Sequence, residues 1–595
     1  MILPRLEWLL PEPVPEPPTF VGFGRPVATL LARRGFVDDE QLGRFLHAGE
    51  ASLHDVSLMA DAGVALDRIE RAIDASERIA IWGDYDADGM TAVVVWVLAL
   101  RAVGVEALRH VPSRLAEGYG LSLAGLERLQ AGGASLLITC DCGVTNAVEV
   151  EEARRLGMEV IVTDHHLPSG ALPRAVAVVD PHRPDCTYPD PDLTGAGIAF
   201  KLASALLARR GRAAADLASV AAIGTIADMA PMTGESRAIV RLGLEELAAT
   251  SRAGLRALLA RAAEVPAQPT ARDLAFGVAP RINAAGRIAD AELAMSLLLE
   301  EDPATAERIA EELEAVHLER RAITSATIDE ARALAIAAPG EGPLALLGDG
   351  WAPGVLGLVA NRLVEALGRP VAVAARVGDE LRGSVRAPGD FHVALALEAS
   401  ASLLLKRGGH PSAGGFSLRT SDWDAFAAAF GALPRPFPAD PGRAAERATA
   451  LTVDLVLPAT HLGWPLAEEI ARLAPFGPGH VEPLLAVTGL RVADARRVGA
   501  AGDHVALRMR RGDEVFDAIA FGTPTDRPLP ESGTALDLVG TLERDLFQGL
   551  PRLRIRVADY AESAVSPLAA RRRIGSVASL PVGSDAAREA TATAR

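Results

Sequence analysis

Three aspartates occupy alternate positions directly after a short apolar run near residue 80. Ile79 to Trp82 is apolar enough for a buried strand, Asp84, Asp86 and Asp88 follow it, and segment 92–100 has the regular apolar character of a helix. Carboxylates this close repel one another unless cations neutralise them, and hard divalent ions such as Mg²⁺ or Mn²⁺ take oxygen ligands. The pattern therefore predicts a strand, an acidic metal-binding turn and a helix. A solvated acidic turn is the alternative, whereas an EF-hand calcium loop is disfavoured because no helix precedes the turn and no glutamate closes it.

The same design recurs further along the chain. Apolar runs at 135–140 and 158–163 end in Asp141 and in the pair His165–His166, and a shorter run ends in Asp180. A lone acid or histidine after a strand is usually a cap or a turn residue. Because the carboxyl ends of parallel strands converge above an open α/β sheet, several such ends in succession predict a site for two metal ions. Carboxylates with imidazoles suit Mn²⁺ or Mg²⁺ better than a structural zinc.

The elements that would position these groups follow an α/β pattern. Short apolar runs alternate with amphipathic segments from about 55 to 250, which is typical of a parallel sheet. Segment 304–335 has the spacing of one long linking helix, and a smaller α/β domain with strands at 344–348 and 370–375 follows it. Two-fold alternation from about 445 to 560 predicts a small β-barrel.

These patterns divide the chain into six expected parts. They are an N-terminal lead 1–54 with a helical stretch near 26–46, a catalytic domain 55–250, a helical linker 251–335, a second α/β domain 336–432, a barrel 445–560 and a disordered tail 561–595.

Composition excludes several classes of protein, namely those that coat nucleic acid through an overall positive charge, those held together by disulfides and those that span a membrane. The 595 residues carry a net charge of −17, which argues against coating nucleic acid through an overall basic field. A local basic groove remains compatible with it, because salt confines charge effects to about 10 Å. Three cysteines cannot form a disulfide framework for a chain of this size, no apolar run is long enough to span a membrane, and the proline-rich start does not resemble a signal peptide. We therefore expect a soluble cytoplasmic protein.

Several motifs resemble a known family. DYDADG at 84–89, TCDCG at 139–143 and TDHH at 163–166 are similar to motifs of the DHH/DHHA1 phosphoesterase superfamily, and most of all to its RecJ family of single-strand-specific exonucleases. The resemblance extends to further stretches, namely 114–121, 193–201, 223–228 and 279–287, and covers nearly all of 20–560. It implies a metal-dependent nuclease that removes mononucleotides 5′→3′ from single-stranded DNA, in DNA repair and recombination.

The resemblance also implies a ligand set. Asp228 would join Asp86, Asp88, Asp141 and His165 as metal ligands, with Asp84 binding an ion directly or supporting a residue that does. We expect two Mn²⁺ or Mg²⁺ ions with Asp141 bridging them, and His166 contacting the scissile phosphate. Asp141, His165 and His166 are thus the expected catalytic residues.

Glycine-flanked polar residues in the second α/β domain are candidates for phosphate binding. On chemistry alone, segments 382–386 and 406–415 are as compatible with surface turns as with a phosphate site. Their similarity to the DHHA1 domain favours substrate binding, although Ala352 stands where that family often has histidine. The expected substrate contacts are Tyr119 as a base-stacking platform, Arg281 and Asn283 in a glycine-bounded loop, Ser384, Arg386, Gly408, Gly409 and His410.

Several questions stay open at the level of sequence. The barrel resembles an OB-fold, and its arginines at 508, 510, 511, 552, 554 and 556 form either an electropositive strand face or a merely solvated one. The resemblance implies single-stranded DNA as substrate, a single-strand-binding protein and a RecQ-type helicase as partners, and no membrane. The alternatives are a DHH phosphodiesterase for short oligonucleotides or cyclic dinucleotides, which needs no barrel, and a non-catalytic DNA-binding scaffold, which needs no metal ligands.

Overall fold

The computed structural model describes residues 1–14, 16–114, 117–168, 170–338, 340–438, 450–499, 502–547 and 550–569. The chain forms two compact units, which are described separately. The larger unit comprises Arg44–Ala448 and Pro475–Val481, and the barrel unit comprises Met1–Gly43, Thr449–Ala474 and Glu482–Arg595.

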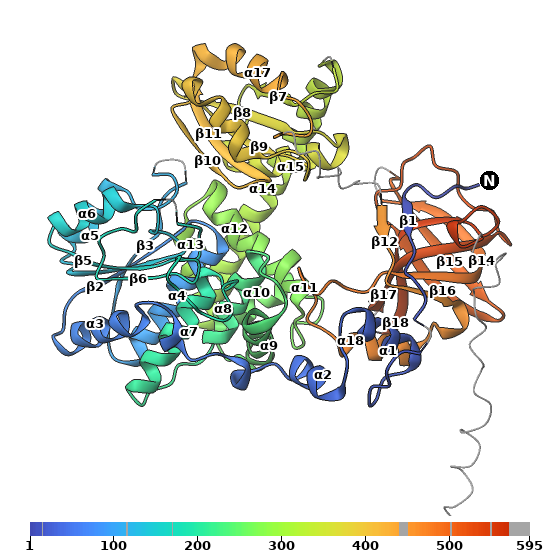
Figure 1. The fold of residues 1–595 in the computed structure, drawn as a ribbon, viewed down its shortest axis with the longest axis horizontal. Helices are drawn as coiled ribbons and strands as arrows, with labels where there is room; N and C mark the ends of the chain where they lie inside the picture. Colours follow the sequence, from blue (N-terminus) through green and yellow to red (C-terminus); the bar gives the residue numbers. More distant parts are fainter. Residues whose placement is uncertain are drawn as a thin grey trace, which may run out of the picture. The chain divides into compact units, whose positions relative to one another are not determined.

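A parallel sheet organises the larger unit (Figure 1). Its strands, in spatial order, are β3 (Leu108–His110), β2 (Ile79–Gly83), β4 (Leu136–Cys140), β5 (Glu159–Thr163) and β6 (Ala177–Val179). The expected succession of strand, acidic turn and helix is confirmed, but the helix α4 (Ala87–Ala102) begins earlier than segment 92–100. Asp88 therefore lies in the first helical turn.

Both faces of this sheet are buried, which explains why its strands are continuous apolar runs. Ile79 and Ile81 face one core, and Ala80 and Trp82 face the other. The helices of the first core include α3 (Ala62–Asp74), α4, α7 (Gly195–Arg209) and α8 (Leu217–Ala227), and those of the second are α5 (Leu123–Ala131) and α6 (Ala147–Arg155).

Strand register aligns the residues that follow the strands. Gly83 pairs with Cys140, Ile138 with Ile161, and Thr163 with Val179. The residues directly after the last position of each strand are aspartates: Asp84, Asp141, Asp164 and Asp180. One row of four aspartates therefore crosses the carboxyl edge of the sheet.

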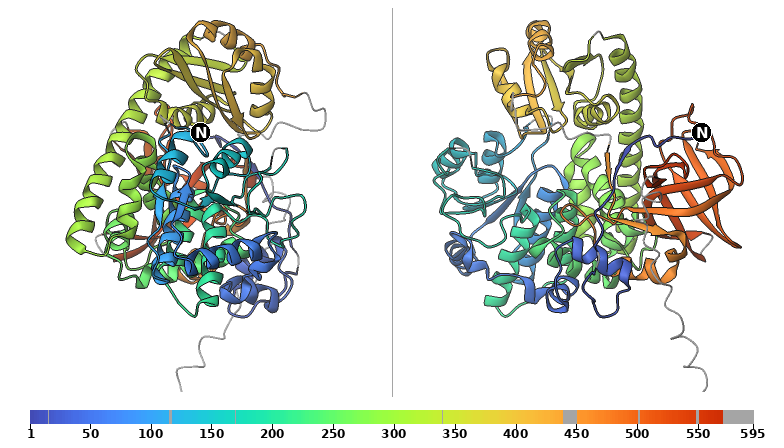
Figure 2. Two further views of the ribbon diagram at one scale, coloured as in Figure 1. Left: turned by 90° about the vertical axis from the view of Figure 1, so that its left-hand side faces the viewer. Right: turned by 45° about the vertical axis from the view of Figure 1, so that its right-hand side comes forward.

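Helices continue the larger unit after α8. They are α9 (Gly234–Ala249), α10 (Ala253–Ala262), α11 (Ala271–Asp273), a π-helical turn (Leu274–Val278), α12 (Ala279–Ile288) and α13 (Ala291–Leu299). The expected long helix is present as α14 (Pro303–Ala337), which packs against α10, α12 and α13 and then against α15 and β7 of the next domain (Figure 2). Arg281 and Asn283 lie within α12, so the expected glycine-bounded loop is wrong.

A second, mixed sheet completes the larger unit. Its spatial order is β10 (Lys406–Gly409), β11 (Ala413–Arg419), β9 (Glu380–Arg386), β8 (Val371–Val377) and β7 (Leu344–Gly348), with helices α15 (Leu356–Leu367), α16 (Val393–Ala399) and α17 (Trp423–Gly431). Segments 382–386 and 406–409 are thus strands rather than surface turns.

The barrel unit has the expected two-fold alternation. Strands β14 (Leu485–Val498), β15 (His504–Arg511), β16 (Glu514–Ala520), β18 (Leu550–Glu562) and β17 (Ala535–Phe547) pair in this order, and β17 pairs back with β14 to close a five-stranded barrel. Strand β13 (Leu455–Pro458) joins β14, and helix α18 (Trp464–Ala471) follows β13.

The chain's first residues belong to this barrel unit rather than to a separate lead of 54 residues. Strand β1 (Glu7–Leu9) pairs with β12 (Ala450–Thr452), and helices α1 (Arg25–Arg33) and α2 (Asp39–Leu46) account for the expected helical stretch. A tail starting at 561 is also wrong, because β18 continues to Glu562 and Leu568 is buried. The remainder of that tail, 570–595, lies outside the described residues.

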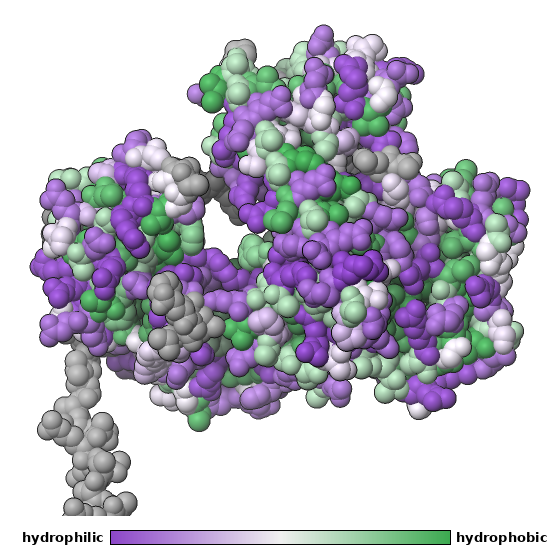
Figure 3. All heavy atoms as spheres, turned by 180° about the vertical axis from the view of Figure 1, so that it is seen from behind, coloured by the Kyte–Doolittle hydropathy of each residue, from purple (hydrophilic) through white to green (hydrophobic). Residues whose placement is uncertain are grey.

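The surface in Figure 3 is mainly hydrophilic, with hydrophobic residues in small groups. In the described part of the chain, no helix combines the length and the hydropathy that crossing a bilayer requires.

Candidate metal centre and phosphate site

The acidic turn is fixed by main-chain amides on two helices. Asp86 caps α4 and accepts hydrogen bonds from the N–H groups of Asp88 (3.0 Å) and Gly89 (3.1 Å). Asp88 accepts from Gly195 (2.7 Å) and Ala196 (3.0 Å) at the start of α7. A Cβ atom on Gly195 would lie 2.5 Å from the Asp141 Cβ, so only glycine lets α7 approach this closely.

Asp141 and His165 lie at the middle of the centre. Asp141 has a left-handed backbone (φ 62°) and is buried. Its Oδ1 lies 3.0 Å from His165 Nε2, which is also 3.9 Å from Asp88 Oδ2 and 3.8 Å from Asp228 Oδ2. The structure therefore brings Asp228, which follows α8, to the same place as the strand-end residues.

The ligand atoms fall into compact groups. Two groups that share no residue are Asp84, Asp86 and Asp141, and Asp88, His165 and Asp228, each with atoms within 4.8 Å of one another. A third group joins Asp141, His165 and His166. All six residues expected to bind metal thus lie in neighbouring or overlapping groups.

Burial and mutual repulsion set the protonation of these carboxyls. Burial, and then the charge of Asp86, raises the pKa of Asp84 well above its ordinary value, and burial and then Asp88 do the same for Asp141. The pKa of Asp228 rises to about 7 for the same two reasons. The buried Asp84 Oδ1 accepts no hydrogen bond from a described residue. A divalent ion that takes oxygen ligands fits this donor set, because it would neutralise the repulsion.

Asp164 orients the second histidine. Its Oδ1 accepts from the His166 N–H (3.1 Å) and lies 2.8 Å from His166 Nδ1. Burial lowers the pKa of His166, but the bond with Asp164 more than offsets this and the pKa is raised. With Nδ1 engaged, Nε2 is the nitrogen left for a substrate. The ring of Tyr119 lies edge-on to that of His166 at 5.5 Å, and the ring of His410 lies at 6.2 Å.

Three arginines without an acidic partner lie beside the centre. Arg114, Arg287 and Arg386 form no ion pair with any described residue, and the charge of Arg114 lowers the pKa of both of the others, after burial. The pKa of Arg287 falls to about 10. Partly buried guanidinium groups that repel one another favour an anion, and phosphate is the anion whose geometry they match.

Ser384 and Arg386 add a helix N-terminus to this arginine cluster. A Cβ on Gly357, in the first turn of α15, would lie 2.9 Å from Arg386 Nη2 and 3.8 Å from Ser384 Oγ. Main-chain N–H groups and the dipole at such a terminus also favour phosphate.

The structure does not bring every expected substrate contact to this place. Arg281 donates two hydrogen bonds to Glu314, at 2.5 and 3.1 Å, so its guanidinium is already neutralised. Asn283 accepts from the Ala87 N–H (2.9 Å) and therefore supports the acidic turn. Gly408 and Gly409 are exposed in β10, next to His410.

Comparison with known proteins agrees with this geometry. Family models match the DHH family, N-terminal domain, over 78–225, the DHHA1 domain over 340–433 and the RecJ OB domain over 453–559. The single-stranded-DNA-specific exonuclease RecJ of Bacillus subtilis is 34% identical over 90% of this chain and 68% of its own length. The Escherichia coli RecJ is 34% identical over 82% and 88%, respectively. The chain belongs to the RecJ family.

Solved structures of a RecJ protein are described as complexes with Mn²⁺ or with Mg²⁺. The RecJ of Thermus thermophilus in complex with Mn²⁺ has a TM-score of 0.78 and 32% identity, covering 94% of this chain and 80% of that one. The same protein in complex with Mg²⁺ has a TM-score of 0.72 and 30% identity, with 94% and 79% covered. Mn²⁺ and Mg²⁺ are also the ions that the carboxylate and imidazole donors of this RecJ-family chain fit.

Sequence reasoning assigned no role to three residues of this RecJ-family site. Asp164 is part of the TDHH motif, and its position before two histidines was the available signal. Arg114 and Arg287 lie in the quoted segments 114–121 and 279–287, but nothing in their spacing marks them.

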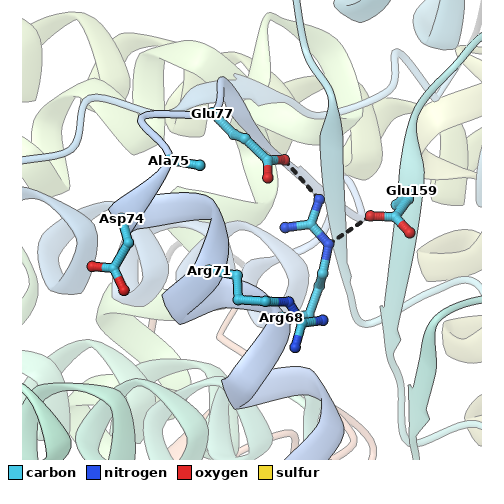
Figure 4. Close-up of a pocket in the computed structure, with 6 residues that line it drawn as sticks. All are labelled: Arg68, Arg71, Asp74, Ala75, Glu77 and Glu159. Atoms are coloured by element: carbon cyan, nitrogen blue, oxygen red, sulfur yellow. Dashed lines mark hydrogen bonds and ion pairs between the residues drawn. The ribbon is translucent and has the colours of Figure 1, made fainter.

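The edge of the sheet opposite the metal centre also has a hollow, in which Arg68 is paired with two glutamates (Figure 4). A cavity of about 670 Å³ is lined by residues such as Arg71 and Ala75 near the amino ends of β2 and β5. Arg68 donates to Glu77 and to Glu159, each at 2.6 Å. The Arg68 guanidinium is therefore already neutralised.

Proposed function

We propose that this chain is a metal-dependent exonuclease that hydrolyses single-stranded DNA from its 5′ end to 5′-mononucleotides. The observation that carries the proposal is the unpaired arginine cluster directly beside the acidic metal centre. The arginine cluster suits a terminal phosphate, and the metal centre suits the phosphodiester that follows it. Family membership supports the substrate, because the relatives are named as single-stranded-DNA-specific exonucleases.

Different residues of the chain would bind the metal ions and contact the scissile phosphate. Asp84, Asp86 and Asp141 would hold one ion, and Asp88, His165 and Asp228 a second, with Asp141 between them. When bound, two such ions supply an activated water and neutralise the phosphate oxygens. Hydrolysis breaks the bond between phosphorus and the 3′ oxygen of the terminal nucleotide, and His166, held through Nδ1 by Asp164, presents Nε2 to the scissile phosphate to assist the departing oxygen.

Polarity follows from the arginine cluster. Arg114, Arg287, Ser384 and Arg386 would bind the 5′-phosphate one nucleotide before the scissile bond. Each cycle releases a nucleotide and leaves a new 5′-phosphate on the shortened strand. The product of one cycle is therefore the substrate of the next.

Digestion of one single strand, labelled at its 5′ or its 3′ end and incubated with Mn²⁺ or with EDTA, tests the proposal. We expect the 5′ label to appear at once as a mononucleotide, only with Mn²⁺, while the 3′ label stays in long products. Early release of the 3′ label, or cleavage of dinucleotides alone, would refute the polarity or the substrate class. A single-strand-binding protein and a RecQ-type helicase remain proposed partners, for which co-purification with this chain is the test.

A further inference from the structure

A short piece of chain, Pro475–Val481, packs against the turn that follows the expected metal ligand Asp228. The residues before and after it in the sequence belong to the barrel unit, but the piece itself belongs to the larger unit, and we call it the inserted segment. No step of the proposed function uses it. The chain therefore supplies part of the larger unit from within the sequence of the barrel.

Asp228 is held differently from the other expected metal ligands. Asp141 and His165 come shortly after strands of the parallel sheet, which fixes their place. Asp228 is the C-cap of α8, and its main-chain N–H donates to the Gly224 carbonyl (2.9 Å). The negative end of the helix dipole lies there, so the helix itself does not favour a carboxylate at this position. Other contacts are needed to hold the side chain of Asp228 in the centre.

The turn after Asp228 ends α8 in a conformation that usually requires glycine. Met229 has a left-handed backbone, with φ 60°. Its N–H donates to the Ile226 carbonyl (3.1 Å), and that of Ala230 donates to the Thr225 carbonyl (3.2 Å). These two hydrogen bonds form a Schellman motif, in which a left-handed residue other than glycine is strained. The other described non-glycine residues with positive φ are all short and polar, namely Asp61, Ser76, Asp141 and Asp216.

The inserted segment contacts the end of this strained turn. The Met232 N–H donates to the Pro478 carbonyl oxygen at 2.6 Å. A Cβ on Gly477 would lie 3.2 Å from Met232 Cε, and one on Gly479 would lie 3.5 Å from Pro231 Cβ. Met232 is buried, so its side chain has little room to move. The inserted segment thus fixes the chain four residues after Asp228.

The inserted segment contains a closed turn of its own. Gly477 and His480 exchange two main-chain hydrogen bonds, at 3.0 and 3.1 Å. Between them lie Pro478 and Gly479 (φ 71°), which are the residue types of a type II turn. The Pro478 carbonyl that accepts from Met232 is therefore held in a defined turn.

Two buried side chains anchor the inserted segment to the larger unit. Arg237 of α9 donates to the Pro475 carbonyl (2.8 Å) and to the Phe45 carbonyl (3.0 Å). The ring of His480 packs against those of Phe45, at 4.7 Å, and Phe476, at 5.2 Å. Arg237 and His480 are both nearly inaccessible to solvent. The inserted segment is therefore built into the larger unit and can oppose the strain at Met229.

We propose that the inserted segment is a positioning element of the metal centre, which holds the strained turn after Asp228 and so keeps this carboxylate where it can bind an ion. The inference rests on the proposed function, since it deepens the assignment of Asp228 as a metal ligand. The metal affinity of the larger unit thus depends on residues that lie within the barrel's part of the sequence.

Gly477→Val in the full chain tests the contact with Met232. The valine side chain would meet the buried methionine and displace the turn. We expect Mn²⁺ affinity, measured by calorimetry, to fall about tenfold, the range set by the strain of one left-handed residue. Gly63→Val, at a glycine whose Cβ would meet no atom within 4 Å, is the matched control and should bind Mn²⁺ as the wild type does. An unchanged affinity in Gly477→Val would overturn the inference.

A double-mutant cycle separates positioning of Asp228 from a general loss of stability. In an Asp228→Asn background, Gly477→Val should have no further effect on Mn²⁺ affinity, because the carboxylate that it displaces is already absent. An equal loss of affinity with and without Asp228 would overturn the inference and leave the proposed function intact. A wild type that binds no Mn²⁺ would instead refute the proposed function.

Met229→Gly tests the strain itself. Glycine adopts a φ of 60° without a steric penalty, so in the Gly477→Val background this change should restore most of the lost Mn²⁺ affinity. Failure to restore it would contradict the role given to the strained cap. If Gly477→Val does not fold, His480→Ala takes its place in both comparisons, because it removes the ring contacts with Phe45 and Phe476 and leaves every main-chain hydrogen bond possible.

Discussion

Two sets of arginines in this protein differ in whether an acidic side chain pairs with them. In the larger unit, Arg114, Arg287 and Arg386 have no acidic partner among the described residues. In the barrel unit, the β18 arginines are paired: Arg552 with Asp517 (2.9 Å), Arg554 with Asp545 (3.0 Å) and Arg556 with Glu543 (3.2 Å).

The difference teaches that arginine density alone does not mark a phosphate site. From the sequence, the β18 arginines could form either an electropositive face for a nucleic-acid strand or a merely solvated face, and in the structure the neighbouring strands supply their counter-charges. Uncompensated charge in a buried setting is costly, so a ligand is the physical reason for keeping it. The same reasoning separates the metal carboxylates from those that pair with Arg68.

Removing an uncompensated carboxylate should have the largest effect. Asp141→Asn keeps the shape of the side chain but removes the charge at the middle of both ligand groups. We expect loss of Mn²⁺ binding by calorimetry and a fall in kcat on the order of 10³-fold or more, several kcal/mol of transition-state stabilisation. Asp545→Asn, a compensated carboxylate of β17, is the control and should retain both. Full activity of Asp141→Asn would disprove its role.

The second largest effect should come from a substitution in the arginine cluster. Arg386→Ala should reduce the preference for a 5′-phosphate over a 5′-hydroxyl end by about 10- to 100-fold, the worth of a charge-assisted hydrogen bond. The measurement is kcat/KM on the two ends. Arg552→Ala in the barrel should leave this preference unchanged, and a retained preference in Arg386→Ala would break the comparison.

A pH effect distinguishes the metal-free from the metal-bound centre. Because the pKa of Asp228 is about 7 when folded, against 3.8 ordinarily, the folded protein holds an extra proton between these values. This carboxyl's contribution to stability is therefore present at low pH and lost as the pH rises through about 7. In EDTA, we expect the melting temperature of the wild type to fall more between pH 5 and pH 8 than that of Asp228→Asn.

Mn²⁺ must displace the same proton, so its affinity for the wild type should weaken as the pH drops below about 7. Identical pH profiles for wild type and Asp228→Asn, with and without Mn²⁺, would contradict this assignment.

The smallest effect should come from the compensated arginines. Arg554→Ala breaks partly exposed ion pairs with Glu543 and Asp545, which should cost about 1 kcal/mol of unfolding free energy or less. Urea denaturation measures this loss, and cleavage of single-stranded DNA by the larger unit's site should be unaffected. A large loss of cleavage instead would mean that the paired arginines also bind the strand.

Strand periodicity made much of the site predictable. A residue that follows a parallel strand has a known place, so Asp84, Asp141 and His165 could be assigned to one edge from sequence. Asp228 follows a helix, where no such rule applies, and only the family resemblance indicated it.

Arg281 and Arg287 illustrate what could not be predicted. Both lie in segment 279–287, of which only Arg281, in the expected loop, was predicted to contact the substrate. In α12, six residues at about 100° each separate the two side chains by about 120° around the axis. One side meets Glu314 of α14 and the other meets Arg114 and Arg386. Which of the two arginines faces Arg114 and Arg386 could therefore be decided only once this segment was known to be a helix.

The pairing of β1 with β12 has a consequence for synthesis of the chain. Glu7 pairs with Ala450, and Trp8 Nε1 donates to Asp559 Oδ2 (3.0 Å). At ordinary rates of translation, β1 is synthesised on the order of a minute before these partners. The nascent amino terminus is thus exposed to chaperones and proteases until translation is nearly finished, and a message cut short before codon 450 yields a chain whose beginning has nothing to fold onto.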